Sequence, residues 1–191
     1  MVYRLWARLR LGPVDRRRPR RGPVLAGLPK GADGLAWGLA WDLAVAPKRG
    51  EAVAGAAADL TKCYDGVRHP LLRRALAAAG WPASLTGPLL SAYSAPRRLR
   101  VGDAIGRFAT PAAGIPAGCP LAVAVLAVLT WPWQLAVEAA GATKARRYID
   151  DLTAWARGPP RHVPQVAAAI WAATAGFVAA AQLQLLSLIH I

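Results

Sequence analysis

Residues 145–156 read Ala-Arg-Arg-Tyr-Ile-Asp-Asp-Leu-Thr-Ala-Trp-Ala, with two adjacent aspartates between two short runs of strand character. The runs 145–149 and 152–156 flank Asp150 and Asp151 as two strands flank a tight turn. Aspartate favours turns, so a solvated turn is enough to explain the pair when it is taken alone. The stretch therefore predicts a β-hairpin that carries two carboxylates at its tip.

A second acidic stretch, Asp-Leu-Thr-Lys-Cys-Tyr-Asp, occupies residues 59–65 and follows another candidate strand end. Taken alone, Asp59 could be a helix cap. Together, the two stretches hold four of the seven acidic residues that follow position 50. Carboxylates that converge from separate strands can hold two magnesium ions about 4 Å apart, which activate an attacking hydroxyl and stabilise a leaving oxygen. The pattern favours two-metal chemistry at a phosphate.

Apolar residues recur at helical spacing between glycine and proline breakers along most of the chain. The expected helices span residues 3–11, 35–45, 70–79, 121–130 and 166–183, the fourth ending before Pro132. Residues 97–110 alternate like a second hairpin, with a turn at 104–106. Short strands mixed with helices indicate an α+β fold. By local propensity alone, the alanine-rich run 53–58 would be a helix.

The chain is strongly basic, with 24 Lys and Arg against 10 Asp and Glu and a formal net charge of +14 over 191 residues. Its length and its 55% apolar content suit about one domain with its own core and exclude a disordered tail. The charge predicts a surface that attracts polyanions, although GC-rich codons alone would also enrich arginine. Cys63 and Cys119 lie far apart, which argues against a zinc site and a disulfide framework.

Two long uncharged stretches suggest an alternative, which is a membrane protein with one or two membrane-spanning helices. Residues 121–131 are too short to cross a bilayer, and glycines and prolines precede them. Residues 166–186 are long enough, but their many alanines favour a buried helix instead. The chain opens without a basic leader followed by an apolar segment. We therefore expect a protein of the nucleus or cytoplasm that is not secreted and does not bind a membrane.

Three segments together resemble motifs A, B and C of reverse transcriptases of the non-LTR retrotransposon and group II intron type. They are Asp-Leu-Thr-Lys-Cys-Tyr-Asp-Gly-Val at 59–67, Gly-Ile-Pro-Ala-Gly-Cys-Pro-Leu-Ala at 114–122 and Tyr-Ile-Asp-Asp at 148–151. They occur in the family's order and at credible spacing, and the resemblance covers roughly residues 53–185. It implies a polymerase palm over 51–185 with an antiparallel sheet backed by helices, incomplete fingers over 1–50, and no thumb.

The resemblance also implies roles for individual residues. The catalytic, metal-binding carboxylates would be Asp59, Asp150 and Asp151, and Tyr148 would support the turn that bears two of them. Tyr64 would be the steric gate against a ribonucleotide's 2′-hydroxyl; its ordinary alternative is core packing.

Three further residues, Gly114, Pro116 and Gly118, would form a loop whose backbone approaches the nucleotide closely. Ala117 stands in that loop where the family usually has Gln.

The activity implied is that of an RNA-directed DNA polymerase, a nucleotidyltransferase that extends a DNA primer on an RNA template with deoxynucleoside triphosphates. Its cofactors would be two Mg2+ ions, with Mn2+ as a substitute, and no stable protein partner is expected. A viral-type RNA-dependent RNA polymerase is the alternative within polymerases. Tyr64 argues against it, and so does Tyr148, where those enzymes often have Gly.

The last six residues, 186–191, read as an in-frame translation of CTGTCTCTTATACACATC, which resembles a transposon-derived sequencing adapter. We therefore expect the natural reading frame to continue past Leu185. The motif D lysine expected after residues 183–185 is absent. The fragment itself is expected to be inactive, because the fingers residues that grip the triphosphate and the thumb are missing from it.

Overall fold

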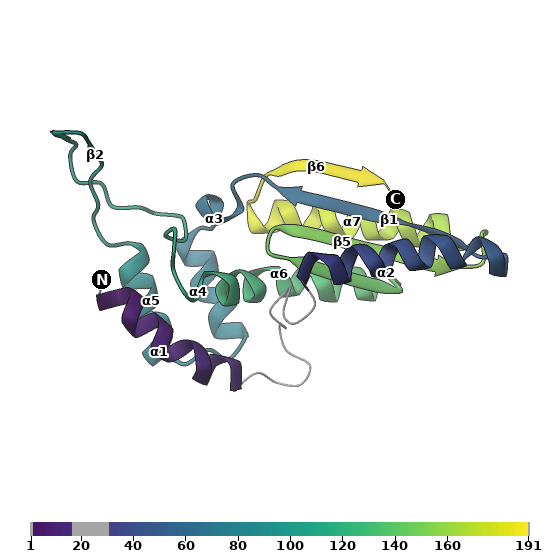
Figure 1. The fold of residues 1–191 in the computed structure, drawn as a ribbon, viewed down its shortest axis with the longest axis horizontal. Coiled ribbons are helices and arrows are strands. Elements are labelled where there is room, and N and C mark those ends of the chain that lie inside the picture. Colours follow the sequence, from purple (N-terminus) through teal and green to yellow (C-terminus); the bar gives the residue numbers. More distant parts are fainter. Residues whose placement is uncertain (1, 17–30, 191) are drawn as a thin grey trace.

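The computed structural model describes residues 2–16 and 31–190 (Figure 1). Within them the chain forms α-helices, a four-stranded antiparallel sheet and a separate two-stranded hairpin. The helices are α1 (Val2–Arg16), α2 (Gly31–Val45), α3 (Cys63–Gly66), α4 (His69–Ala78), α5 (Ala83–Tyr93), α6 (Ala122–Ala139) and α7 (Val163–Ala181), with a 3-10 turn at Pro47–Arg49. The strands are β1 (Ala52–Leu60), β2 (Arg100–Val101), β3 (Ala104–Ile105), β4 (Lys144–Tyr148), β5 (Asp151–Gly158) and β6 (Leu185–His190).

The main sheet has the order β4-β5-β1-β6, and each neighbouring pair is antiparallel. Helix α6 precedes β4 and helix α7 connects β5 to β6, which is the split β-α-β arrangement. The predicted α+β class and the antiparallel sheet backed by helices are confirmed.

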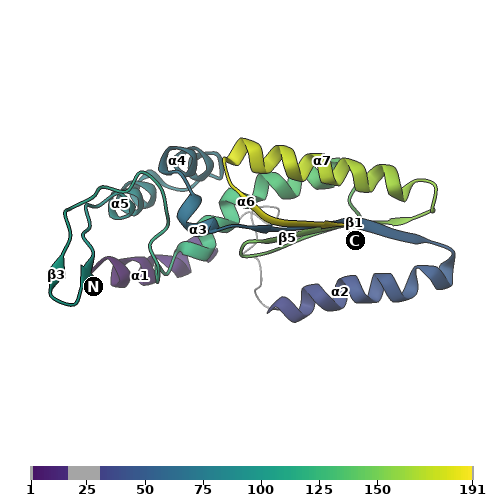
Figure 2. The same cartoon turned by 90° about the horizontal axis from the view of Figure 1, so that it is seen from above.

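The two faces of the sheet are covered differently (Figure 2). Helices α6 and α7 lie on one face, where Leu152, Ala154 and Ala156 of β5 are buried. Helix α2 lies on the other face, which receives the alternate residues of β5, including Trp155. The indole of Trp133 on α6 donates a hydrogen bond to Thr174 on α7 at 3.0 Å, which joins the two helices of the first face.

Strand β1 forms in spite of its alanines because it is the central strand, paired with β5 on one side and β6 on the other. Gly55 permits this close pairing, since a Cβ there would lie 2.1 Å from the carbonyl oxygen of Ala154. Pairing on both sides outweighs a local helix preference that amounts to a few tenths of a kcal/mol per residue. Residues 53–58 are therefore part of a strand. The resemblance implied a strand here, whereas local propensity predicted a helix.

Three details differ from the sequence-based expectations. Helix α6 continues through Pro132 to Ala139, and buried residues on both sides of the proline, among them Leu129, Trp133 and Val137, hold it in the core. The second hairpin turns at residues 102–103 instead of 104–106, since Gly102 adopts the left-handed conformation with φ of 59°.

The third difference is α5, which the sequence did not predict because Gly87 and Pro88 lie inside it. Pro88 is exposed, and the helix is held by its buried residues Leu89, Leu90 and Tyr93. The other expected helices form, each with bounds shifted by a few residues.

Two helices of the described chain, α6 and α7, are long and apolar enough to cross a membrane. Helix α6 is more than half buried within the protein, and α7 packs on β1 and β5 along one side.

Strand β6 includes most of the six residues that resemble an adapter translation. It pairs with β1 at the edge of the sheet, with Ile189 opposite Ala57. The hydrogen bonds of an edge strand are made by its backbone, so most residues of moderate strand propensity can form one. A strand at 185–190 is therefore compatible with an adapter-derived sequence.

Candidate active site

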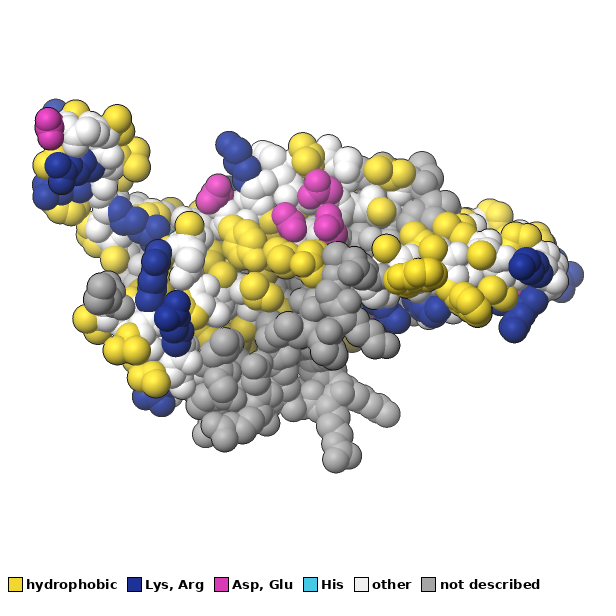
Figure 3. All heavy atoms as spheres, in the orientation of Figure 1, with side chains coloured by type: hydrophobic (Ala, Val, Ile, Leu, Met, Phe, Trp, Pro, Cys, Tyr) yellow, Lys and Arg dark blue, Asp and Glu magenta, His cyan; other side chains and the backbone are white. Residues whose placement is uncertain are grey.

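The three predicted carboxylates lie near one another at one end of the sheet. The register pairs Ala58 of β1 with Leu152 of β5, and Asp59 and Asp151 are the residues next to this pair in the two strands. Asp151 is in turn paired with Tyr148 of β4. Asp150 lies in the two-residue turn between β4 and β5. Figure 3 shows acidic side chains gathered near the end of β1 and the β4–β5 turn. We call Asp59, Asp150 and Asp151 the acid cluster.

Backbone strain is concentrated next to the acid cluster. Among the described residues, three that are not glycine have positive φ, and Lys62 (44°) and Ile149 (59°) both adjoin the cluster. For a β-branched residue such as Ile149 this conformation is a genuine outlier, and strain of this kind costs about 1–3 kcal/mol. The turn is at residues 149–150 instead of the predicted 150–151, and a two-residue hairpin turn requires positive φ at its first residue, which here is Ile149.

The three carboxylates interact electrostatically with one another and with Cys63. Asp151 is exposed, but partial loss of its hydration raises its pKa, and the charges of Asp150 and Asp59 raise the pKa further. Burial raises the pKa of the Cys63 thiol to about 12, with added contributions from Asp150 and Asp59. Within the described part of the chain, no side chain forms an ion pair or hydrogen bond with the acid cluster. Among the residues that the structure describes, no cation is paired with these carboxylates.

The donor chemistry of the cluster fits a hard divalent cation, because Mg2+ prefers carboxylate oxygens and would supply the missing positive charge. The three carboxylates are farther apart than the ligands of a bound metal ion would be. In residues 2–16 and 31–190, no three side chains of His, Cys, Asp or Glu stand close enough together to hold a metal ion as placed. Asp59, Asp150 and Asp151 are the residues that would hold it.

Tyr64 lies beside the acid cluster, on the short helix α3 that follows β1. Its side chain is half-buried and packs against the main core. Burial raises the pKa of the Tyr64 hydroxyl, and Asp150 contributes to the shift, which places the phenol within electrostatic reach of the β4–β5 turn. Both interpretations of Tyr64, a gate and a core residue, are compatible with this position.

The predicted glycine loop, residues 114–118, is fastened to the segment that carries Tyr64. The amide of Ile115 donates to the carbonyl of Tyr64 at 2.8 Å, and Gly114 N donates to Val67 O at 2.8 Å. His69 contributes a further contact from Nε2 to the Gly114 carbonyl at 2.9 Å. The structure therefore brings together the loop and Tyr64, whose segments are about fifty residues apart in the chain.

Two glycines of the loop have conformations that other residues rarely adopt. Gly114 has φ of 98° and Gly118 has φ of 73°, and Pro116 lies half-buried between them. A Cβ on Gly118 would approach the guanidinium of Arg4 to 2.9 Å. Arg4 also donates from Nη2 to the carbonyl of Ala117 at 3.3 Å.

Arg4 is a neighbour of the loop that the sequence analysis did not identify as a site residue. The adjacent Tyr3 anchors α1 by its hydroxyl contact with Cys119 Sγ at 3.0 Å. Nothing in the local pattern of residues 2–10 distinguishes Arg4 from the other arginines of that helix.

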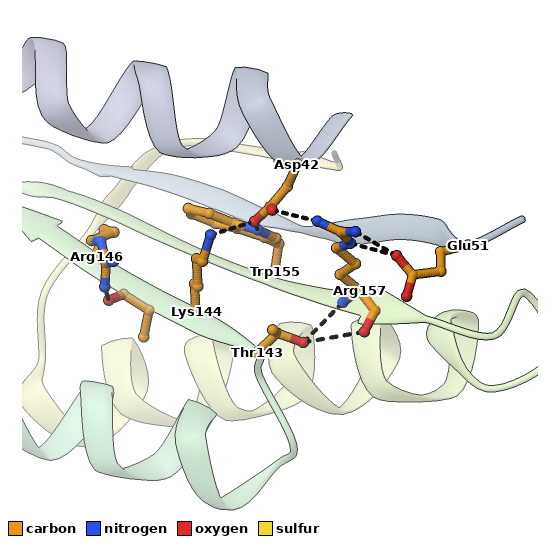
Figure 4. Close-up of polar contacts among 8 residues, drawn as sticks. Asp42, Glu51, Thr143, Lys144, Arg146, Trp155 and Arg157 are labelled. Carbon is orange, nitrogen blue, oxygen red and sulfur yellow. Dashed lines mark hydrogen bonds and ion pairs between the residues drawn. The ribbon is translucent and has the colours of Figure 1, made fainter. Parts of the chain in front are cut away.

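The sheet face that carries the acid cluster is covered over only part of its length, by α2. Asp42 on α2 is buried and accepts hydrogen bonds from Lys144 Nζ at 2.7 Å and from Trp155 Nε1 and Arg157 Nη1, both at 2.9 Å (Figure 4). Arg157 also pairs with Glu51 at 2.6 Å. This network, which the sequence analysis missed, holds α2 over the half of the face away from the acid cluster.

A scan against known protein families and a search among curated proteins both find no match for this chain.

Proposed function

We propose that this chain is the palm of an RNA-directed DNA polymerase, a reverse transcriptase of the non-LTR retrotransposon and group II intron type. The observation that carries the proposal is the acid cluster. Asp59 lies at the end of β1, and Asp150 and Asp151 lie at the β4–β5 turn beside Ile149, which has a positive φ. The ordered resemblance of the three motifs supports the same conclusion.

In this proposal, each part of the site has a separate task. The acid cluster would hold Mg2+, which when bound activates a primer hydroxyl and stabilises the leaving oxygen of the triphosphate. The glycine loop presents backbone without obstructing side chains, because Gly114 and Gly118 lack Cβ atoms. Tyr64, placed between the loop and the β4–β5 turn, would contact the sugar of the incoming nucleotide.

The substrate assignment rests on Tyr64. An aromatic ring beneath the sugar excludes a 2′-hydroxyl, the group by which RNA precursors differ from DNA precursors. The half-buried position of Tyr64 beside Asp150 is compatible with that role. Deoxynucleoside triphosphates are therefore the proposed substrates, with RNA as template and DNA as primer.

The decisive experiment is primer extension by Asp150→Asn, made in the complete reading frame that residues 1–185 are expected to belong to. We expect extension to fall to background while template binding changes less than about twofold, because the substitution removes one charge and no volume. Glu138→Gln, an exposed neutralisation on α6, is the matched control and should retain extension. Normal extension by Asp150→Asn would exclude the proposed site.

Metal binding can be tested on the 191-residue chain itself. A ligand that binds only the folded state raises its melting temperature by mass action. Added Mg2+ or Mn2+ should raise the melting temperature of the parent chain and of Glu138→Gln, and should have a smaller effect on Asp59→Asn and Asp150→Asn. Equal shifts in all four proteins would mean that the ions bind elsewhere.

A further inference from the structure

The hairpin β2–β3 projects from the body of the molecule (Figures 1 and 2). Every residue from 95 to 110 is exposed. The base of the hairpin is closed by two hydrogen bonds between Arg97 and Ala109, of 2.9 and 2.8 Å, and Arg97 also donates to the carbonyl of Tyr93 at the end of α5. We call residues 95–110 the arginine hairpin. None of its side chains is buried in the core of the protein.

The first strand of the arginine hairpin alternates between cations and apolar residues. Arg98 and Arg100 alternate with Leu99 and Val101 along the sequence, and all four side chains are exposed. Asp103 is its one acidic residue, and it pairs with Arg100 at 3.8 Å with both side chains exposed. Such an exposed pair contributes less than about 1 kcal/mol and leaves Arg100 available to a stronger partner.

An aromatic ring is part of the same basic surface. The guanidinium of Arg98 lies over the ring of Phe108 at 5.1 Å from its centroid. Phe108 is 67% exposed, so a large part of the ring meets solvent. Arg107 precedes it in the chain and adds another exposed cation.

We infer that the arginine hairpin binds a single-stranded nucleic acid. Arg98, Arg100 and Arg107 would contact phosphates, and an unpaired base would stack on the free part of the Phe108 ring. The inference rests on the proposed function for the identity of that strand as template or primer overhang. The binding chemistry follows from the hairpin alone.

Charge and ring chemistry favour nucleic acid over other partners. A guanidinium presents a planar fork of donors that matches phosphate oxygens. Proteins that hold single strands without reading their sequence combine a basic surface with aromatic rings on which unpaired bases stack. The net charge of +14 over the whole chain draws polyanions toward every such surface.

The test is fluorescence anisotropy of labelled 16-nucleotide single strands, RNA and DNA, with the 191-residue chain over a range of salt concentrations. In Arg98→Ala/Arg107→Ala we expect binding at low salt to weaken at least tenfold. The slope of log affinity against log salt should decrease in magnitude by about 1.4, which corresponds to two lost phosphate contacts. The matched control is Arg73→Ala/Arg74→Ala on α4, which removes the same charge from two exposed residues and should lose less than threefold.

Phe108→Leu separates stacking from charge. This variant should weaken binding at least fivefold, within the range expected for one lost base stack, and should leave the salt slope unchanged. Circular dichroism should show all variants folded, because every substituted side chain is exposed.

Three results would overturn the inference: equal losses in the hairpin and α4 variants, tighter binding of a 16-base-pair duplex than of single strands, or hairpin-dependent binding to phosphatidylserine vesicles without hairpin-dependent binding to oligonucleotides. The assay contains no nucleotide triphosphate, so it is independent of catalysis. Hairpin-dependent binding in a full-length protein that cannot extend a primer would support the inference and contradict the proposed function. Primer extension with unchanged binding by the hairpin variants would do the reverse.

Discussion

Asp42 on α2 accepts a hydrogen bond of 2.9 Å from the indole nitrogen of Trp155 on β5, and both side chains are buried. This contact fixes α2 to the sheet face that carries the acid cluster. Trp155 lies four residues along β5 from Asp151, so among the described residues α2 is held over the part of the face that is away from the acid cluster. The placement of the proposed active site thus depends on a carboxylate that has no part in its chemistry.

The first prediction is that Asp42→Asn destabilises the fold. The substitution leaves Arg157 and Lys144 facing a neutral group, and removing one partner of a buried charge network costs about 3 kcal/mol. Urea denaturation at pH 7 measures the loss. Glu51→Gln, which alters a more exposed partner of Arg157, should cost less than about 1 kcal/mol. Equal losses for the two variants would contradict the central position given to Asp42.

The same variant should show a defined pH dependence. Burial opposes the ionisation of Asp42, but hydrogen bonds from Lys144, Trp155 and Arg157 outweigh burial and lower its pKa. A lowered pKa contributes stability above the ordinary value of 3.8 and loses it as the pH falls through the folded-state value. The difference in stability between the parent and Asp42→Asn should therefore be constant near neutrality and shrink below about pH 4.

The second prediction concerns Gly55. A Cβ there would meet the Ala154 carbonyl at 2.1 Å and the Trp155 Cα at 2.6 Å, so Gly55→Ala must push β1 and β5 apart. We expect a loss of about 3 kcal/mol, at the upper end for overpacking. The control, Gly176→Ala on α7, has no atom within 4 Å of the new Cβ and should gain about 0.5–1 kcal/mol as a helix substitution. Thermal denaturation of both variants distinguishes the two effects, and a tolerated Gly55→Ala would mean that the strands are less closely paired.

Local patterns were sufficient for the β4–β5 hairpin and for most helices, because strand alternation and helical spacing act within about ten residues. They were insufficient for β1, where alanine favours a helix and the deciding contact of Gly55 lies on another strand. They also missed α5, because Gly87 and Pro88 locally oppose a helix and the burial of Leu89, Leu90 and Tyr93, which outweighs that cost, depends on the rest of the fold.

The acid cluster was predicted from sequence because its members lie at the ends of recognisable segments. Asp42 was not, and its partners explain why: Lys144, Trp155 and Arg157 are 102, 113 and 115 residues away. No local pattern distinguishes such an aspartate from an exposed one on a helix.

The third prediction is that Asp151→Asn stabilises the protein. Burial and the charges of Asp150 and Asp59 raise the pKa of Asp151, so its ionised form is disfavoured in the folded state. A raised pKa contributes stability below the ordinary value of 3.8 and loses it as the pH rises through the folded-state value. Removing the charge should therefore help at pH 7, by about 0.5 kcal/mol at an exposed position, and should not help at pH 3.

Asp103→Asn is the control for this prediction, because Asp103 is exposed and pairs with Arg100. Its neutralisation should give no gain at pH 7. Chemical denaturation at pH 7 and at pH 3 measures the change in stability. If Asp151→Asn stabilised the protein equally at both pH values, repulsion within the acid cluster would not be the cause.

The fourth prediction separates the two interpretations of Tyr64 by nucleotide selection. If its ring lies beneath the incoming sugar, Tyr64→Ala in the complete reading frame opens space for a 2′-hydroxyl and should raise ribonucleotide over deoxynucleotide incorporation at least tenfold. Tyr64→Phe keeps the ring and should keep the selection. The readout is the ratio of the two incorporation efficiencies, because a ratio cancels any loss of folded protein.

If Tyr64 is only a core residue, Tyr64→Ala should act on stability instead. The side chain is half-buried, so its truncation should cost about 3 kcal/mol, at the low end for a large aromatic residue. Both incorporation efficiencies would then fall together and their ratio would stay constant. An unchanged ratio would reject the gate, and with it the reason for preferring a DNA-synthesising enzyme over an RNA-synthesising one at this site.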